Sequence, residues 1–393
     1  MNRVHQERNH IDLLVLIAVL TLMVLSLGVV YSAGSTWADM RLQGSDKFLI
    51  AHTVKVLLGL LTIFVVMHID YRVYRKVTKP VVLSAVVLLM VTLALGGEVK
   101  GASRWLHFGG FGLQPSEFAK YALLFHLCTL ITTKGVLIRN FKFGFLPMIV
   151  WIGSVTVLVL LQPNFSTGAM IFGISLVMLY LGHAKVTHIG LTIGALVPLL
   201  LGYMVSAEYR MQRIMTYLNG SGDGSTTGGH QLHQGIIGFG NGGIFGLGPG
   251  GSRQRELFLP ESYGDFVFSI VGEEYGLIGT LFVLALFLTI LLRGLKTAKH
   301  ARDDFGRVLA LGITVTVTLY ALVNAGVTLG ILPTTGLPMP FVSYGGSSIL
   351  FSSAAVGVLL NISSQTDLHP RVISAPDGIR PIEPMQLQAQ GNA

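Results

Sequence analysis

Acidic side chains gather in one short stretch of this sequence. The stretch ELFLPESYGDFVFSIVGEEYG belongs to a chain of which only 12% is charged. It holds the carboxylates of Glu256, Glu261, Asp265, Glu273 and Glu274. A positioned carboxylate can accept the proton of an attacking hydroxyl group, which is the task of a general base. This stretch is therefore the first candidate for chemistry.

Asp265 differs from the other four acids by its position. It stands where a glycine-rich segment enters an apolar run that predicts a helix. Asp is a preferred helix cap, so one interpretation of Asp265 is purely structural. Capping does not explain the charges of Arg253, Arg255, Glu256 and Glu261 close by. Together these residues predict a compact surface of mixed charge.

Three other patterns are weaker indications of a functional site. His230 and His233 have the spacing of two metal ligands, but no third ligand is marked, so solvated histidines are the better interpretation. The motif GFGNGG lacks the strand, helix and distant acid of a dinucleotide site. Cys128 is the single cysteine, which excludes an intrachain disulfide.

The elements that must position these residues are apolar. Hydrophobic residues make up 51% of the chain and the mean hydropathy is +0.66. Runs such as Leu13–Tyr31 are long enough, at about 1.5 Å per residue, to cross a hydrocarbon core of about 30 Å. The sequence predicts an all-α polytopic membrane protein with about ten transmembrane helices. Their predicted ranges are 12–32, 48–68, 81–96, 116–133, 145–162, 168–184, 186–206, 266–292, 306–331 and 342–362.

The basic residues predict how these helices are oriented. Most of the 27 Lys and Arg residues fall on the side of the N-terminus if the helices alternate in direction. Cytoplasmic loops carry an excess of Lys and Arg, so both termini are predicted to be cytoplasmic. A nucleic-acid-binding protein would instead place its net charge of +8 on one soluble face. A cleaved signal peptide is the alternative for the first run, but that run is long and many similar runs follow it.

The chain divides into three parts. We expect a cytoplasmic tail at 1–11, a membrane domain at 12–362 and a disordered cytoplasmic tail at 363–393. One large extracytoplasmic loop, about 207–265, lies between the seventh and eighth predicted helices. Within it, residues 235–251 interleave glycine with large apolar side chains, which predicts a re-entrant or interfacial segment folded against the bundle.

Charges inside or beside apolar runs are informative, because a charge at the bilayer centre costs at least about 2.5 kcal/mol. Arg104, Glu117 and Lys120 lie in the segment KGASRWLHFGGFGLQPSEFAK, and the last two share one helix face. They form either an interfacial ion pair or a cationic cradle for an anionic head group. Glu273 and Glu274 lie deeper in the eighth helix and need polar surroundings or a position near the interface.

Several motifs together resemble a known family. GASRWL, LQPSEFAK, LLQPNFSTG, GHQLHQGIIGFGNGGIFGLGPG, LPESYGDFVFSIVGEEYGLIG and ILPTTGLPMPFVSYGGSSIL occur in the order found in the SEDS family, which comprises FtsW, RodA and the sporulation homologue SpoVE. The resemblance covers about 12–362. It implies a ten-helix inner-membrane enzyme that polymerises lipid II into glycan strands together with a class B penicillin-binding transpeptidase.

The resemblance also implies roles for individual residues. Asp265 matches the catalytic aspartate of the family motif. The implied substrate-binding residues are Arg104, Glu117, Lys120, Gln231, Gln234 and Glu261. Two positions depart from the family pattern: Asn164 stands where an acid is common, and Leu257 stands where many members have an acid. An amide at 164 cannot act as a base, so no catalytic role is expected for that turn.

The implied reaction fits these residue types. The 4-hydroxyl of an acceptor sugar attacks the anomeric carbon of a lipid-linked donor, and polyprenyl pyrophosphate leaves. Asp265 would take the hydroxyl proton, while Arg and Lys side chains offset the charge of the pyrophosphate. No nucleotide is needed, and a divalent cation, Mg²⁺ or Mn²⁺, could add positive charge. The expected partners are lipid II, membrane lipid, the transpeptidase and other divisome proteins, with no nucleic acid.

Two other classes of function remain open at this point. A transporter that flips lipid II would also use intramembrane charges and broken helices, although no inverted repeat is visible. A scaffold that recruits a transpeptidase would not need Asp265. Within the family, the stretch NFSTGAMIF and the extended C-terminal tail favour a role in septal synthesis at cell division over a role in elongation.

Overall fold

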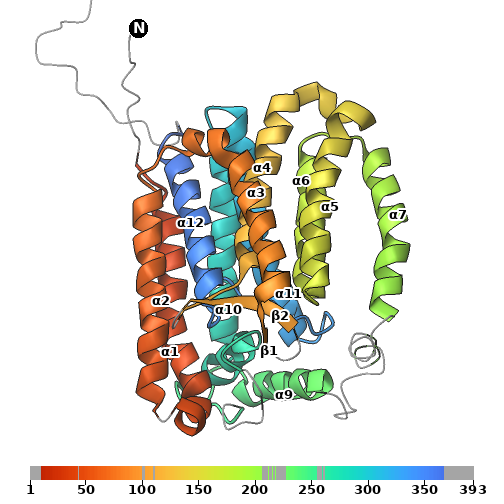
Figure 1. The fold of residues 1–393 in the computed structure, drawn as a ribbon. Helices are drawn as coiled ribbons and strands as arrows, with labels where there is room; N and C mark the ends of the chain where they lie inside the picture. Colours follow the sequence, from red (N-terminus) through yellow and green to blue (C-terminus); the bar gives the residue numbers. More distant parts are fainter. Residues whose placement is uncertain are drawn as a thin grey trace, which may run out of the picture.

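The helices of this protein run side by side in a bundle, and one further helix lies across an end of it (Figure 1). The computed structural model describes residues 10–42, 44–99, 102–108, 111–205, 211, 215, 217, 227–254, 259 and 262–366. The bundle comprises α1 (Leu13–Leu42), α2 (Ser45–Val66), α3 (Tyr71–Leu95), α4 (Pro115–Lys134), α5 (Leu146–Leu161), α6 (Phe165–Leu181), α7 (Val186–Val205), α10 (Val267–Lys299), α11 (Asp304–Thr328) and α12 (Gly346–Ser363). The crossing helix is α9 (Thr227–Gly242).

The predicted membrane fold is confirmed. Each predicted helix overlaps one helix of the bundle. Among the described residues, 9 helices are long and apolar enough to cross a membrane, and α6, with 17 residues, is slightly shorter. The predicted boundaries are less accurate: α3 begins at Tyr71 rather than at 81. The Asp70 side chain accepts the Arg72 N–H at 2.9 Å and caps the helix, which then continues through Pro80.

The bundle has central and peripheral helices. Of the most apolar 18-residue window in each, α12 buries 78% and α11 buries 72%, whereas α7 buries 6%. The outward faces of the outer helices carry large apolar side chains, among them Leu61, Phe64 and Leu199. In water such a surface would be unfavourable, so these faces suit a hydrocarbon environment.

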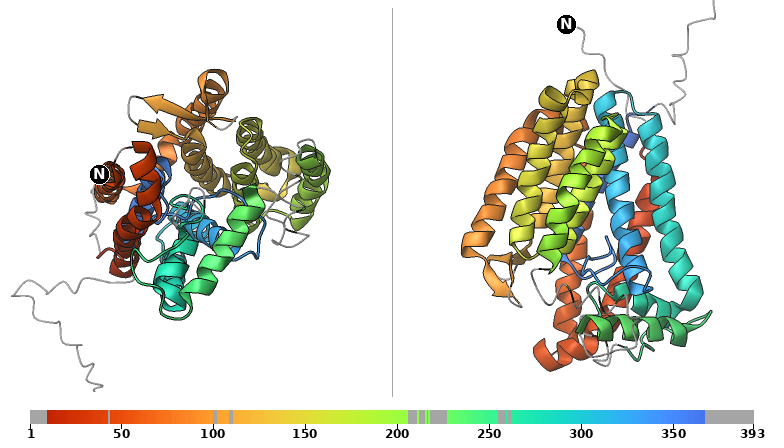
Figure 2. Two further views of the ribbon diagram at one scale, coloured as in Figure 1. Left: turned by 90° about the horizontal axis from the view of Figure 1, so that it is seen from below. Right: turned by 90° about the vertical axis from the view of Figure 1, so that its right-hand side faces the viewer.

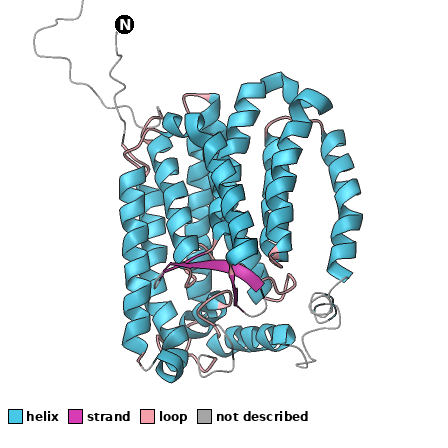
Figure 3. Ribbon diagram, in the orientation of Figure 1, coloured by secondary structure: helices cyan, strands magenta, loops and turns pink. Residues whose placement is uncertain are grey.

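Three short strands, which the sequence analysis did not predict, connect α3 to α4 (Figure 3). They are β1 (Gly97–Val99), β2 (Ala102–Phe108) and β3 (Phe111–Leu113). β2 pairs antiparallel with both neighbours, with Leu106 opposite Leu113. This small sheet places Arg104 at the same end of the bundle as α9 (Figure 1).

The predicted loop at 207–265 contains a helix that was not predicted, α9. Residues 235–251 lie against the bundle, as predicted, since α9 and the turn after it pack on α10. Gly242 permits this close approach, because a Cβ there would lie 2.0 Å from the Gly272 carbonyl oxygen. The right-hand view of Figure 2 shows α9 lying across the end of the bundle.

The turn after α9 is built into a break in α10. Gly276 has φ 63°, outside helical geometry, and kinks α10. The turn supplies the missing backbone partners: Leu247 N–H donates to the Glu273 carbonyl at 2.9 Å, and Leu277 N–H donates to the Gly243 carbonyl at 2.9 Å. A broken helix can exist inside a membrane protein when other backbone satisfies its free groups, as here.

The two ends of the bundle differ in charge. The end at which α1 begins is opposite α9 (Figure 1), and we call it the basic end, since the short connections there carry Arg72, Lys134, Arg139, Lys185 and Lys299. Ion pairs also close this end, with Arg72 Nε 3.0 Å from Asp303 and Arg293 Nε 2.8 Å from Asp12. The other end, which holds α9, the strands and Asp265, is called the Asp265 end below.

Candidate active site

Asp265 lies just before α10 and is not the cap of that helix. The N-cap position is Phe266, and no side chain caps it through a hydrogen bond. Asp265 is partly exposed, at the point where the segment from α9 enters the bundle. The structure therefore gives the N-cap position of α10 to Phe266 rather than to Asp265.

A buried amide fixes the backbone at Asp265. Asn324, in α11, is 1% exposed. Its Nδ2 donates to the Asp265 carbonyl oxygen at 2.7 Å and to the Leu337 carbonyl oxygen at 2.7 Å. Leu337 belongs to the segment between α11 and α12, so this one side chain joins that segment to the Asp265 segment.

The segment between α11 and α12 also passes close to the carboxylate, at Gly336. A Cβ added at Gly336 would lie 3.4 Å from Asp265 Oδ2, and Gly336 has φ 74°. Further along, Tyr344 N–H donates to the Tyr263 carbonyl at 2.9 Å. The segment that contains Asp265 is thus joined to the segment between α11 and α12 at two points, at Tyr263 directly and at Asp265 through Asn324.

Aromatic rings support this arrangement. Tyr263 and Tyr344 meet edge to face with centroids 5.6 Å apart, and Phe48 of α2 stacks on Tyr344 at 4.5 Å. Ser262 Oγ donates to the Ala33 carbonyl of α1 at 2.9 Å. Burial raises the pKa of the Tyr344 phenol above its usual value, so this ring stays neutral. The segment before Asp265 is consequently anchored to α1 and α2.

Glu117 and Lys120 form a buried ion pair. Lys120 Nζ lies 2.8 Å from Glu117 Oε2, and their side chains are 4% and 2% exposed. Lys120 also lies over the ring of Tyr320 in α11, 3.9 Å from its centroid. Of the two interpretations, the ion pair is confirmed, but it lies in the core of the bundle rather than at an exposed interface. Substrate binding by these two residues stays a prediction.

Arg104 has different partners from Lys120. Its guanidinium donates to the Gln162 carbonyl at 3.2 Å and to the Pro163 carbonyl. Gln162 Nε2 in turn donates to the Leu89 carbonyl of α3 at 3.0 Å. Arg104 therefore holds the turn between α5 and α6, where Asn164 is the residue before the first turn of α6. The structure does not place Arg104 and Lys120 on a common partner among the described residues.

Glu273 and Glu274 face polar groups inside the protein. Glu273 accepts hydrogen bonds from Ser252 Oγ, from the Gln254 N–H at 3.2 Å and from Asn241 Nδ2 at 3.3 Å. Glu274 accepts one from Ser32 Oγ of α1. The polar surroundings that the sequence analysis required for these two acids are present.

Of the remaining predicted residues, those that the structure describes lie on α9. Gln231 and Gln234 are partly buried residues of that helix. Glu256 and Glu261 lie outside the described residues. His230 and His233 are also on α9, and the described part of the chain has no group of three or more His, Cys, Asp or Glu residues that could hold a metal ion. A divalent cation at this end of the bundle stays a prediction.

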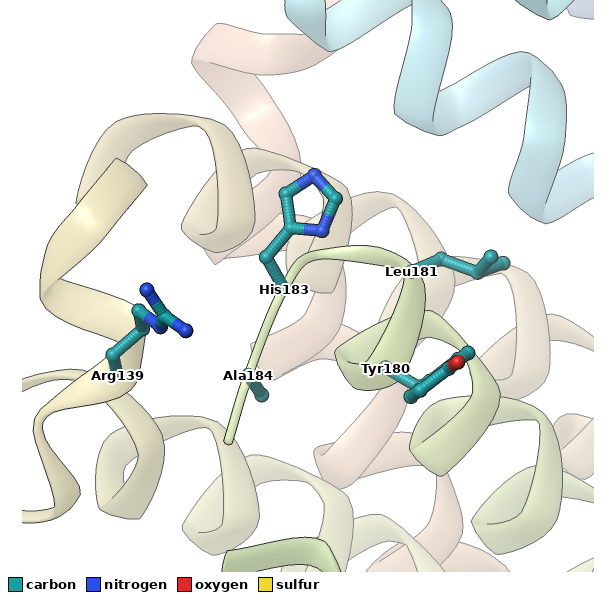
Figure 4. A pocket seen from close by; sticks show the side chains of 5 residues that line it. All are labelled: Arg139, Tyr180, Leu181, His183 and Ala184. Carbon is teal, nitrogen blue, oxygen red and sulfur yellow. The ribbon is translucent and has the colours of Figure 1, made fainter. Parts of the chain in front are cut away.

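One cavity lies at the basic end of the bundle. It has a volume of about 340 Å³ and is lined by Arg139, Tyr180, Leu181, His183 and Ala184 (Figure 4). No carboxylate lines it, and it is at the opposite end from Asp265. It is therefore separate from the candidate active site.

Two positioning residues were not predicted from the sequence. Asn324 lies inside the predicted helix 306–331, and Gly336 is one glycine among 48. The amide of Asn324 was a usable signal, because a polar side chain inside a membrane helix needs a hydrogen-bond partner. Which carbonyls it binds follows only from the three-dimensional structure.

Comparison with known proteins agrees with this geometry. The family model for the cell cycle proteins FtsW, RodA and SpoVE matches residues 12–368. The chain belongs to this family, SEDS. A SEDS relative in Geobacter metallireducens, named probable peptidoglycan glycosyltransferase FtsW, is 38% identical over 362 residues, which are 92% of this chain and 96% of the relative. Stage V sporulation protein E of Bacillus subtilis is 37% identical over 356 residues, 90% of this chain and 96% of that one.

Solved structures of SEDS proteins share the fold. The rod shape determining protein RodA of Thermus thermophilus superposes with a TM-score of 0.67 at 25% identity, covering 90% of this chain and 96% of that one. A chain of a peptidoglycan synthase complex gives a TM-score of 0.74 at 24% identity, covering 90% of this chain and 97% of that one. The resemblance that the sequence motifs indicated is confirmed at the level of family and fold.

Proposed function

We propose that this protein is a peptidoglycan glycosyltransferase that polymerises lipid II into glycan strands, with Asp265 as its general base. The observation that carries the proposal is the placement of Asp265. Its carboxylate is partly exposed at one end of the bundle, and its backbone is fixed by Asn324. Relatives named as peptidoglycan glycosyltransferases support the reaction class.

The reaction assigns a simple task to Asp265. The 4-hydroxyl oxygen of the acceptor sugar forms a bond to the anomeric carbon of the donor. The bond from that carbon to the pyrophosphate oxygen breaks, and undecaprenyl pyrophosphate leaves with the bonding electrons. Asp265 accepts the hydroxyl proton, which makes the oxygen a better nucleophile as the bond forms. Fixing the backbone at 265 holds the base in place before the sugar arrives.

The site lies on the extracytoplasmic side in this proposal. The basic end of the bundle carries Arg72, Lys134 and Arg139, which suits the cytoplasmic face of a cell membrane. Asp265 at the opposite end then faces the compartment in which glycan strands are assembled. The polyprenyl chain of the substrate can remain in the bilayer beside the bundle, which accounts for a membrane-embedded enzyme.

The proposed setting is septal cell-wall synthesis at the inner membrane of a dividing bacterium. Relatives named FtsW support the division role over RodA-like elongation with the same chemistry. The proposed protein partners are a class B penicillin-binding transpeptidase and other divisome proteins. The structural neighbour in a complex that coordinates polymerization and crosslinking supports a transpeptidase partner.

An assay with labelled lipid II distinguishes this function from lipid transport. Purified protein in liposomes, with and without the transpeptidase, is given lipid II, and both glycan length and transbilayer movement are measured. We expect wild-type protein to produce polymer and Asp265→Asn to produce almost none. Movement of lipid II without polymer from the wild type would support a transporter and contradict the proposal.

A further inference from the structure

Lys55 is a charged residue near the middle of an otherwise apolar helix. It lies ten residues after Ser45 at the start of α2, or about 15 Å along a helix that rises about 1.5 Å per residue. This helix is among those apolar enough to span a membrane, with a mean hydropathy of 2.2. An ammonium group at such a depth is unfavourable unless an anion or a polar path compensates it.

No carboxylate compensates Lys55 in the part of the chain that the structure describes. Its ammonium group lies over the ring of Tyr344, whose centroid is 3.5 Å from Nζ, and His52, three residues earlier on α2, carries no negative charge to balance it. Lys120 provides a contrast, because it has both a ring, that of Tyr320, and the carboxylate of Glu117 at 2.8 Å. A cation over a ring gains about 0.5–2 kcal/mol, which is less than burying the ammonium group at this depth costs.

The surroundings of Lys55 add further positive potential. Its side chain lies against the first turn of α12, since a Cβ at Gly346 would be 3.4 Å from Lys55 Cδ. The N-cap of α12 is Gly345, and no side chain caps it. The N-terminal turn of a helix carries a partial positive charge, so α12 repels the ammonium group rather than balancing it. An anion placed between them would interact favourably with both the ammonium group of Lys55 and the N-terminal turn of α12.

Lys55 is also connected to the candidate active site. The ring beneath it belongs to Tyr344, whose N–H donates to Tyr263 at 2.9 Å, and Tyr263 is two residues before Asp265. Lys55 is partly exposed. In the proposed reaction the anion that reaches this depth of the bundle is the diphosphate that joins lipid to sugar.

We propose that Lys55, with the first turn of α12, binds the diphosphate group of the lipid-linked substrate and of the departing polyprenyl diphosphate. This inference rests on the proposed function for the identity of the ligand. Lys55 is a binding residue here, and Asp265 remains the group that accepts the proton. The ammonium group would stabilise the charge that develops on the leaving diphosphate.

A binding experiment tests this inference apart from catalysis. Farnesyl diphosphate lacks a sugar and cannot be polymerised, so its binding to the purified full-length protein in detergent is measured for wild type, Lys55→Met and Lys55→Arg. Loss of one charge-assisted contact should weaken binding of farnesyl diphosphate about 10- to 100-fold in Lys55→Met. Lys55→Arg should recover most of the affinity, and binding of uncharged farnesol should be unchanged in all three.

Lys47→Met is the matched control, because Lys47 is an exposed lysine of the same helix. It should bind farnesyl diphosphate as tightly as wild type. Equal binding by wild type and Lys55→Met would overturn the inference, and so would an equal loss of farnesol binding, which would indicate a structural role. Asp265→Asn is assayed separately for polymerisation. If it polymerises normally while Lys55→Met loses diphosphate binding, the base assignment fails and the diphosphate site stands.

Discussion

The position of Asp265 depends on contacts to its backbone as well as on its own side chain. Asn324 donates to the carbonyls of Asp265 and Leu337, both at 2.7 Å, from a site that is 1% exposed. Buried carbonyls that lose their donor are costly, so the two segments should separate when the amide is removed. If a catalytic base is displaced by about 1 Å, the rate of the reaction it catalyses can fall about a hundredfold.

The first prediction concerns this amide. Asn324→Ala should lower kcat for lipid II polymerisation by about 10- to 100-fold, with a smaller change in KM, because the base is misplaced while most substrate contacts remain. Steady-state rates measured with labelled lipid II test this. Asn140→Ala is the control: Asn140 accepts two backbone N–H groups, at 3.0 and 3.2 Å, at the basic end. Equal losses of kcat in the two variants would contradict the positioning role.

Gly336 gives a second prediction at the same scale. Gly336→Ala places a Cβ 3.4 Å from Asp265 Oδ2 and forces alanine to φ 74°, which costs about 1–2 kcal/mol. Gly330→Ala has a similar strain, with φ 76°, but its Cβ would meet Ile236 at 3.1 Å instead. Melting temperatures should fall for both variants, whereas polymerisation should fall strongly only for Gly336→Ala. Retention of full activity by Gly336→Ala would show that the carboxylate does not depend on this contact.

Single residues were predictable from the sequence only where their type was unusual for their place. Asp265 stood out because it combines a position directly before an apolar helix with a match to the family motif. The ion pair of Glu117 and Lys120 followed from their spacing on a helix. The partners of Arg104 could not be predicted in this way. The carbonyls of Gln162 and Pro163 are far from Arg104 in the sequence, and they meet it only through the packing of the folded chain.

At the scale of elements, α9 and α10 form one unit. The turn after α9 provides backbone partners at the kink of α10, and Glu273 holds the end of that turn through Ser252, Gln254 and Asn241. A carboxylate that accepts several hydrogen bonds links the two elements through charge-assisted contacts.

Two adjacent glutamates therefore give different predictions. Glu273→Gln replaces an acceptor with an amide that faces donors, so hydrogen exchange in residues 241–254 should become about tenfold faster or more. Glu274→Gln should loosen the contact with Ser32 of α1 and leave 241–254 protected. Hydrogen exchange followed by mass spectrometry measures both. The same exchange pattern in the two variants would be inconsistent with this division of roles.

The sequence analysis placed the elements well where they were apolar and less well where glycine was dense. Glycine has a low helix propensity, so residues 227–242 did not indicate a helix on their own. In the structure Gly238 and Gly242 let the backbone of α9 lie against α10, and this packing outweighs the low helix propensity of glycine. The strands at 97–113 were missed because glycines interrupt their alternating pattern.

At the scale of the whole molecule, the number of bundle helices followed from hydropathy, because every spanning segment must satisfy its backbone internally. How the helices are arranged did not follow. That α11 and α12 lie at the centre and α7 at the edge depends on packing between segments far apart in the sequence. The predicted orientation rests on the uneven charge of the two ends.

Cysteine labelling tests this orientation. Cys128 is 0% exposed, so it should react little with a membrane-impermeant maleimide. A cysteine introduced at exposed Arg253, near the Asp265 end, should be labelled in intact spheroplasts, whereas one at exposed Lys299, at the basic end, should react only after permeabilisation. Labelling with the opposite pattern would place Asp265 in the cytoplasm and contradict an extracytoplasmic site.

The most direct test of the account is the rate at which Asp265→Asn polymerises labelled lipid II relative to wild type. Asp304→Asn is the matched control, since Asp304 is an exposed acid at the basic end and its side chain is 74% exposed. The account predicts that Asp265→Asn folds normally and loses about 10²- to 10⁴-fold in kcat, while Asp304→Asn keeps the wild-type rate. A folded Asp265→Asn protein that polymerises as fast as wild type would contradict the assignment of Asp265 as the general base.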